Sequence, residues 1–123
     1  MNVVIVDDEP LARERLARMV LALGGFRIIG QAGHGQEAVR MARDLSPDVV
    51  LMDVRMPGMD GLEASRRLRD GVANRETPII AVTGAASPEE IAACREAGMT
   101  GWVEKPIKPH DLYVALFGNG AAL

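Results

Sequence analysis

Short apolar runs of four or five residues alternate with longer segments of helical periodicity five times along this chain. The apolar runs predict strands over about 3–6, 26–30, 48–52, 79–82 and 101–104. Helices are expected between and after them, over about 12–23, 36–45, 62–70, 87–98 and 109–117, the last broken by Gly118-Asn119-Gly120. This alternation implies βαβ units with right-handed crossovers and a parallel sheet buried on both faces. A chain of 123 residues fits one domain with one hydrophobic core.

Composition and charge exclude several classes of protein. The net charge of −3 argues against a general nucleic-acid binder, and no apolar run approaches the roughly 18 residues that cross a bilayer. The first residues, Met1-Asn2-Val3, look like a natural start and lack the pattern of a signal peptide. Cys94 is the only cysteine, which excludes an internal disulfide and a cysteine metal cage. We therefore expect a cytoplasmic protein. Cys94 stands at helical spacing from Ile91 and Ala97 and is expected to be a small core residue.

Polar residues of a particular kind stand at the end of each predicted strand except the second. Carboxylates follow the first and third strands, a hydroxyl follows the fourth and an amine follows the fifth: Asp7, Asp8, Asp53, Thr83 and Lys105. Because the carboxyl ends of parallel strands lie along one edge of the sheet, where such folds bind ligands, these groups are expected in one crevice. The sequence therefore predicts a site for a metal ion and a phosphoryl group.

The three carboxylates explain why a metal ion is expected. Two like charges 4 Å apart repel by about 1 kcal/mol in water and by several times more at lower effective dielectric. A bound cation relieves this repulsion. Oxygen ligands suit Mg²⁺ or Mn²⁺, whereas zinc is disfavoured because neither cysteine nor histidine stands at the strand ends.

The segments that carry these residues resemble the receiver domain of response regulators in two-component and phosphorelay signalling. The matching segments are Val4-Ile5-Val6-Asp7-Asp8-Glu9, Met52-Asp53-Val54-Arg55-Met56-Pro57-Gly58-Met59-Asp60-Gly61, Val82-Thr83-Gly84 and Glu104-Lys105-Pro106. The resemblance covers nearly the whole chain. It implies an α/β, flavodoxin-like (βα)5 fold with three α/β/α layers and a doubly wound, five-stranded parallel sheet in the order 2-1-3-4-5. Residues 1–123 would then form a single receiver domain, with no output domain in the chain.

The resemblance also implies a role for each site residue. Asp53 is the phosphoacceptor, and Asp8 and Asp53 bind Mg²⁺ (or Mn²⁺) directly while Asp7 acts mainly through water. The backbone carbonyl of Arg55 completes the metal ligands from the protein. Thr83 and Lys105 bind phosphate oxygens, and the Lys105–Pro106 peptide bond is expected to be cis.

A switch is implied beyond the site itself. In the family, the modified aspartate draws the threonine inward, and an aromatic residue three positions before the lysine rotates into the vacated space. That residue is Trp102 here, where the family usually has tyrosine or phenylalanine, so the chain departs from the pattern. The signal is expected on the face formed by the fourth helix, the fifth strand and the fifth helix.

The implied function is that of a signalling receiver that is phosphorylated by a histidine kinase or a histidine phosphotransfer domain. It would catalyse only its own phosphorylation and dephosphorylation, and it would act on a downstream effector protein or a tethered output domain. No direct contact with nucleic acid or membrane is expected, and exposed Tyr113, Leu116 or Phe117 would mark a partner or homodimer face. The first half resembles receivers of transcription regulators, and residues 77–116 resemble receivers of hybrid kinases. A stand-alone regulator and an excised receiver therefore both remain open.

Two other functional classes fit parts of the same pattern. A metal-dependent phosphohydrolase also uses Asp, Thr, Lys and Mg²⁺, but it usually carries a second acid two residues after its nucleophile, where this chain has Arg55. A phosphorylation-independent binding module is disfavoured because the acceptor, the acid pocket, Thr83 and Lys105 are all present. Arg55 itself is interpreted either as tuning dephosphorylation or as a solvated loop cation.

A glycine pattern after the second strand has a separate interpretation. The segment Gly33-His34-Gly35-Gln36-Glu37-Ala38 formally matches the G-x-G-x-x-A fingerprint of dinucleotide sites. It follows the second strand rather than the first, so we interpret it as a glycine-bounded turn into a helix. His34 and His110 have no metal-ligating partner at useful spacing.

Overall fold

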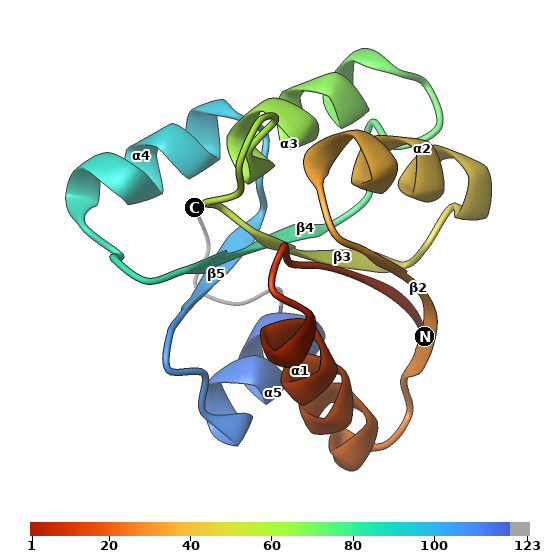
Figure 1. The fold of residues 1–123 in the computed structure, drawn as a ribbon, viewed down its shortest axis with the longest axis vertical. Coiled ribbons are helices and arrows are strands. Elements are labelled where there is room, and N and C mark those ends of the chain that lie inside the picture. Colours follow the sequence, from red (N-terminus) through yellow and green to blue (C-terminus); the bar gives the residue numbers. More distant parts are fainter. Residues whose placement is uncertain (119–123) are drawn as a thin grey trace.

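Five parallel strands form one sheet in the computed structural model, which describes residues 1–118 of the chain (Figure 1). In chain order the elements are β1 (Asn2–Val6), α1 (Pro10–Leu23), β2 (Arg27–Ala32), α2 (Gly35–Leu45), β3 (Val49–Asp53), α3 (Gly61–Asp70), β4 (Ile79–Thr83), α4 (Pro88–Glu96), β5 (Gly101–Glu104) and α5 (Pro109–Phe117). The strand order is β2-β1-β3-β4-β5, and all neighbouring strands are parallel. The predicted doubly wound α/β fold is therefore confirmed.

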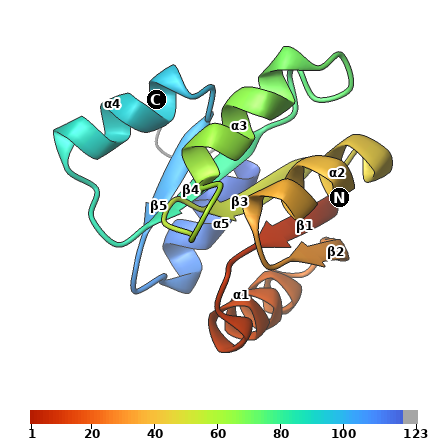
Figure 2. The same ribbon diagram turned by 45° about the horizontal axis from the view of Figure 1, so that its top comes forward.

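Helices cover both faces of the sheet, and the strand sequences supply a core for each. Helices α1 and α5 lie on one face, and α2, α3 and α4 lie on the other (Figures 1 and 2). Side chains alternate between the faces of a strand, so Val3 and Ile5 of β1 join the core with α1 and α5, whereas Val4 and Val6 join the other core. This is why the central strands are continuous apolar runs.

Burial on both faces of the sheet is incomplete at β2, although Ile28 and Ile29 pack against the two different cores. Its residues Arg27 and Gln31 are exposed, and Ile28, Ile29 and Gly30 are only half-buried. The physical reason is position, because β2 is an edge strand and, within residues 1–118, pairs with β1 alone. The central strands β3 and β4, in contrast, are buried at every residue.

Several element boundaries differ from the predicted ones by one or two residues. Strand β2 begins after Phe26 and continues to Ala32, β3 includes Asp53, and α4 ends at Glu96 rather than near Gly98. The helix starts follow from capping, since the side chains of Asp60 and Ser87 accept hydrogen bonds at the N-termini of α3 and α4. Helix α5 ends at Phe117, and of the expected Gly118-Asn119-Gly120 break only Gly118 lies within the described residues.

The glycine pattern after β2 is accounted for by packing. The His34 side chain accepts a hydrogen bond from the Glu37 backbone N–H at 3.2 Å and caps α2. A Cβ at Gly35 would lie 2.4 Å from the Met59 carbonyl oxygen, so only glycine fits where α2 begins against the loop before α3. The interpretation as a turn into a helix is therefore supported.

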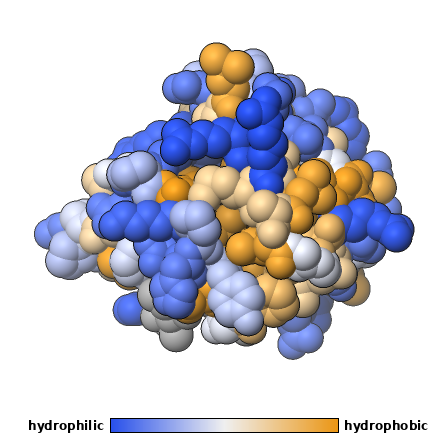
Figure 3. All heavy atoms as spheres, turned by 90° about the horizontal axis from the view of Figure 1, so that it is seen from below, coloured by the Kyte–Doolittle hydropathy of each residue, from blue (hydrophilic) through white to orange (hydrophobic). Residues whose placement is uncertain are grey.

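The face formed by α1 and α5 carries exposed apolar side chains. Tyr113 and Phe117 are about half exposed, at 48 % and 50 %, whereas Leu116 is buried. Figure 3 shows this face, with apolar side chains gathered near its middle and hydrophilic ones around them. Within residues 1–118, no helix combines the length and the apolar character needed to cross a membrane.

Candidate active site

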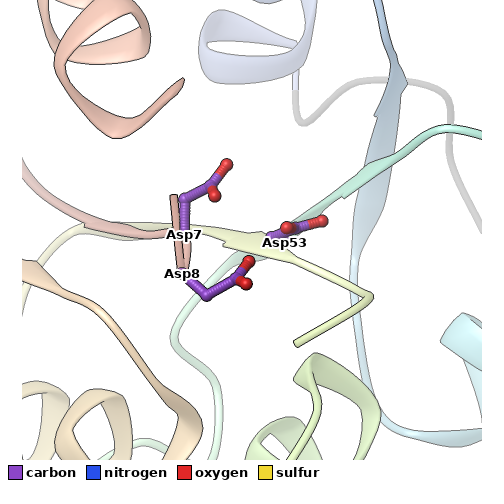
Figure 4. Close-up of side chains that lie close together, drawn as sticks. All are labelled: Asp7, Asp8 and Asp53. Atoms are coloured by element: carbon purple, nitrogen blue, oxygen red, sulfur yellow. The ribbon is translucent and has the colours of Figure 1, made fainter. Parts of the chain in front are cut away.

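Three carboxylates meet at the carboxyl ends of two neighbouring strands. Asp7 and Asp8 directly follow β1, and Asp53 is the last residue of β3. Their side chains point into the same space (Figure 4), and one carboxylate oxygen from each lies within 4.8 Å of the others. Asp7 and Asp53 are buried, whereas Asp8 is half-buried. The sheet topology thus brings together the acids that sequence order separates by about 45 positions.

The backbone and carboxylate of Asp7 are fixed by three neighbours. Its N–H donates to the Ala32 carbonyl at 3.1 Å, and its Oδ1 accepts from the Glu9 backbone N–H at 2.9 Å. Arg13 Nη1 donates to the Asp7 carbonyl oxygen at 2.7 Å. The extra length of β2, which reaches Ala32, therefore helps to place the first acid of the site.

Lys105 brings an amine to the same cluster from the end of β5. Its Nζ lies 3.4 Å from Asp53 Oδ1 and 3.8 Å from Asp7 Oδ2, and its side chain is 38 % exposed. The Lys105 backbone N–H donates to the Thr83 carbonyl at 2.8 Å, which ties the residue after β5 to the end of β4. The Lys105–Pro106 peptide bond, expected to be cis, is cis.

Burial and charge act in opposite directions on Asp53. Burial raises the pKa of the Asp53 carboxyl above its usual range, and the negative charge of Asp7 raises it further. The Lys105 ammonium lowers it by its charge and hydrogen bond, but the net direction remains upward. A group of buried, mutually repelling carboxylates is a favourable site for a hard divalent cation, and the half-buried Asp8 leaves one side accessible to solvent ligands. The donor set fits Mg²⁺ or Mn²⁺.

The glycine that opens α3 lets the end of β3 and the start of the helix come close. A Cβ at Gly61 would lie 2.3 Å from the Asp53 carbonyl oxygen. The Gly61 N–H donates to the Val54 carbonyl at 3.0 Å. The spacing from Asp53 to Gly61 in the sequence thus has a steric reason in the fold.

Thr83 is buried, and its hydroxyl has a partner that the sequence did not suggest. The Thr83 hydroxyl donates to Glu90 Oε2 at 2.7 Å and accepts from the Ala85 N–H at 3.1 Å. The guanidinium of Arg55, from the loop after Asp53, donates to Glu90 Oε1 at 2.6 Å, although 75 % of the Arg55 side chain is exposed. The interpretation of Arg55 as a solvated loop cation is thus incomplete, because its guanidinium also pairs with a buried carboxylate.

Glu90 was missed because it was interpreted only as a helix-start acid. It lies in the first turn of α4 beside Glu89, yet it is only 7 % exposed. The signal in the sequence is its spacing, since Glu90, Cys94 and Ala97 fall on one side of the helix and all three are buried. Cys94 is a core residue as expected, and burial raises the pKa of its thiol, but Ile91 is only half-buried.

Trp102 lies on β5, where it is paired with Ala81 of β4. It is half-buried and packs against the core on the α2, α3 and α4 side of the sheet. Trp102 stands two positions before Glu104, at the edge strand that leads to Lys105. Its response to modification of Asp53 stays a prediction.

Comparisons with known proteins agree with this geometry. The family model for the response regulator receiver domain matches residues 3–117. The chain is 44 % identical over 117 residues to the positive alginate biosynthesis regulatory protein of Pseudomonas aeruginosa, covering 94 % of this chain and 46 % of that protein. It spans about half the length of the curated relatives it matches first.

Solved structures give the same result. The receiver domain of sensor histidine kinase PA1611 from Pseudomonas aeruginosa, with a magnesium ion coordinated in its active site cleft, is 34 % identical with a TM-score of 0.84, covering 94 % of this chain and 93 % of that one. Vibrio cholerae chemotaxis protein CheY4 is 32 % identical with a TM-score of 0.86 and covers 94 % of both chains. The chain therefore belongs to the response regulator receiver domain family, and its function is in phosphorelay signalling.

Proposed function

We propose that Asp53 accepts a phosphoryl group from a phosphohistidine donor in a Mg²⁺-dependent reaction. The observation that carries this proposal is the position of the Asp53 carboxylate. It lies within 4.8 Å of carboxylate oxygens of Asp7 and Asp8 and 3.4 Å from the Lys105 amine. Nucleophile, cation ligands and a positive charge for the transferred group are therefore adjacent.

In the proposed step an Asp53 carboxylate oxygen attacks the phosphorus while the bond from phosphorus to the donor imidazole nitrogen breaks. The ionised carboxylate needs no general base. Bound Mg²⁺ supplies positive charge beside the phosphoryl oxygens. Lys105 neutralises oxygen charge from the other side, and Thr83 donates a hydrogen bond to a phosphoryl oxygen. The chain thus mostly positions the group and offsets its charge.

The proposed metal ligands follow the same geometry. Asp8 and Asp53 hold Mg²⁺ or Mn²⁺ directly, Asp7 acts mainly through water, and the backbone carbonyl of Arg55 adds a further oxygen. Burial of Asp7 and Asp53 supports this assignment, because two buried carboxylates gain most from a cation. The Arg55 N–H lies 3.4 Å from Asp53 Oδ1, which places the Arg55 backbone next to the acceptor.

The proposed partners are a histidine kinase or a histidine phosphotransfer domain as donor, and an effector protein or a tethered output domain as the target. We place the domain in the cytoplasm, without direct contacts to nucleic acid or membrane. The half-exposed Tyr113 and Phe117, whose ring centroids are 4.4 Å apart, support a partner or homodimer contact on α5. The chain is proposed to act as a single receiver domain that catalyses only its own phosphorylation and dephosphorylation.

The proposed output is a switch on the face of α4, β5 and α5. New phosphoryl oxygens at Asp53 draw the Thr83 hydroxyl toward the site, and Trp102 responds to the space left behind. The proximity of the elements supports this, since the Thr83 carbonyl accepts from Lys105 N–H and β4 pairs with β5.

Phosphate incorporation tests the proposal. Incubation with Mg²⁺ and a small phosphodonor such as acetyl phosphate is expected to give one acid-labile acyl phosphate per chain, located at Asp53 by mass spectrometry. Asp53→Asn should abolish it. Asp60→Asn is the matched control, because it makes the same change at the far end of the loop that follows Asp53, and an asparagine can still cap α3. Undiminished labelling of Asp53→Asn would remove Asp53 from its role.

Turnover separates a receiver from a phosphohydrolase. A receiver takes up about one phosphoryl group per chain and releases it slowly, whereas a phosphohydrolase consumes donor continuously. Measuring acetyl phosphate consumed per chain over time distinguishes the two. Arg55 occupies the position of the second acid of a phosphohydrolase and pairs with Glu90, which favours the receiver outcome.

A further inference from the structure

Glu90 is a buried carboxylate that joins the loop after the acceptor to the end of the neighbouring strand. Its Oε1 accepts from Arg55 Nη2 at 2.6 Å, and its Oε2 accepts from the Thr83 hydroxyl at 2.7 Å. The Glu90 side chain is 6 % exposed. Each oxygen therefore has a separate partner, and both partners come from segments that flank Asp53.

Helix capping does not explain why the Glu90 carboxylate is buried, whereas its two hydrogen-bond partners, Arg55 and Thr83, do. A buried carboxylate is strongly disfavoured unless it is paired. The neighbouring acid, Glu89, lies in the same first turn of α4 and is exposed, so helix capping does not require burial. Capping is met by Ser87, whose Oγ accepts from the Glu90 N–H at 3.1 Å.

The Thr83 hydroxyl has a single proton, and its nearer acceptor is Glu90 Oε2 at 2.7 Å, whereas the Ala85 carbonyl oxygen lies at 3.3 Å. A phosphoryl oxygen on Asp53 would need the same proton. Glu90 and the phosphoryl group are both anionic, so they compete for one donor. When Thr83 turns away, the Arg55 guanidinium remains on Glu90, so the buried carboxylate keeps a charged partner.

We propose that Glu90 is a positioning residue that holds Thr83 in the conformation of the unmodified domain and competes with the Asp53 phosphoryl group for the Thr83 hydroxyl. Glu90 does not touch the reacting atoms. It acts through Thr83, and its effect is to disfavour the modified conformation. This inference rests on the proposed role of Asp53 as acceptor and adds a residue that sets how readily the domain switches.

The direct test is the affinity of the domain for beryllofluoride, a mimic of the phosphoryl group, in saturating Mg²⁺, measured by isothermal titration calorimetry. Glu90→Gln replaces a charged acceptor by a neutral one of equal size, and hydrogen bonds to charged groups are the stronger ones. We expect about fivefold tighter beryllofluoride binding, on the scale of the difference between such hydrogen bonds. Glu89→Gln, which removes the same charge from the same turn, should change it less than about twofold.

Two further measurements distinguish this role from a general structural one. The affinity for Mg²⁺ alone should be the same in Glu90→Gln and wild type, because Glu90 is not among the clustered acids. In a Thr83→Ala background, Glu90→Gln should no longer tighten beryllofluoride binding, because the shared donor is gone. If Glu90→Gln fails to fold, Glu90→Asp provides the same comparison, since its shorter carboxylate retreats from Thr83 and retains the charge.

The outcomes separate this inference from the proposed function. Beryllofluoride binding that is unchanged or weaker in folded Glu90→Gln, or a gain that persists in full without the Thr83 hydroxyl, would overturn the role of Glu90. Failure of the wild-type domain to bind beryllofluoride at Asp53 would instead overturn the proposed function. The expected result is tighter beryllofluoride binding in Glu90→Gln and little change in Glu89→Gln.

Discussion

The Lys105 amine lies 3.4 Å from Asp53 Oδ1 and also 3.8 Å from Asp7 Oδ2. One positive charge therefore lies close to two of the three clustered carboxylates in the unmodified domain. The same amine is placed by the backbone hydrogen bond from Lys105 to Thr83. A bound metal ion and Lys105 therefore compensate the same negative charge. Substitution of Lys105 is expected to strengthen metal binding and to slow phosphorylation.

Lys105→Met should separate these two effects. Removing the ammonium leaves the carboxylates more negative, so Mg²⁺ is expected to bind several-fold more tightly. The rate of phosphorylation by acetyl phosphate should fall at least about tenfold, because the transferred group loses a stabilising charge. Mg²⁺ titration by calorimetry and acyl phosphate formation measure the two quantities. Lys108→Met, at an exposed position before α5, is the control and should change neither; parallel losses of both would contradict the role of Lys105.

Asp53→Asn should raise the thermal stability of the metal-free domain. Because burial raises the pKa of Asp53, the folded state binds this proton more readily than the unfolded state, so the ionised carboxylate destabilises the fold at neutral pH. We expect a Tm a few degrees above wild type at pH 7.5 in EDTA. The difference should narrow as pH falls through the raised pKa, and Mg²⁺ should favour the wild type. A Tm at or below that of wild type in EDTA would argue against a destabilising Asp53 charge.

Trp102 fluorescence should report the state of Asp53, because Trp102 is the only tryptophan of the chain. Adding Mg²⁺ with beryllofluoride is expected to change its emission in the wild type and to have no such effect in Asp53→Asn. In Thr83→Ala, binding should persist while the emission change is reduced, if the coupling runs through Thr83. Constant emission despite proven modification of Asp53 would refute a Trp102 switch.

Gly61→Ala should destabilise the fold by about 1–3 kcal/mol. The added Cβ would lie 2.3 Å from the Asp53 carbonyl oxygen, so the end of β3 and the start of α3 must move apart. Gly84→Ala is the matched control, because a Cβ there would meet no atom of the described residues within 4 Å. Urea unfolding gives both free energies, and equal stabilities of the two variants would mean that the close approach at Gly61 is readily relieved.

Much of the fold could be predicted from the chain because its signals are local. Alternating apolar runs gave the strands, and the residues at their ends gave Asp7, Asp8, Asp53, Thr83 and Lys105 as one cluster. The edge position of β2 was implied by the resemblance, through the strand order 2-1-3-4-5, but the incomplete burial of its side chains depends on how the whole sheet is assembled. The extension of β2 to Ala32, which holds the Asp7 backbone, depends on the same assembly.

Glu90 marks the limit of prediction from the sequence. In the sequence, Glu90 is one of two adjacent acids at the start of a helix. Acidic residues are common there and are usually solvated. Only the packing of α4 beside β4 and the loop after β3 distinguishes it from Glu89, by burying one carboxylate between Arg55 and Thr83.

The sequence by itself determined the strands, their order along the chain and the residue types at each strand end, because these follow from hydrophobic periodicity and from motifs of adjacent residues. Tertiary structure alone decided the distances within the cluster and the partner of the Thr83 hydroxyl. Asp53 and Lys105, whose side chains are in contact, are 52 positions apart in the chain. Thr83 and Glu90, which share a hydrogen bond, are seven positions apart. Their distances depend on burial and on packing between elements, which no local pattern encodes.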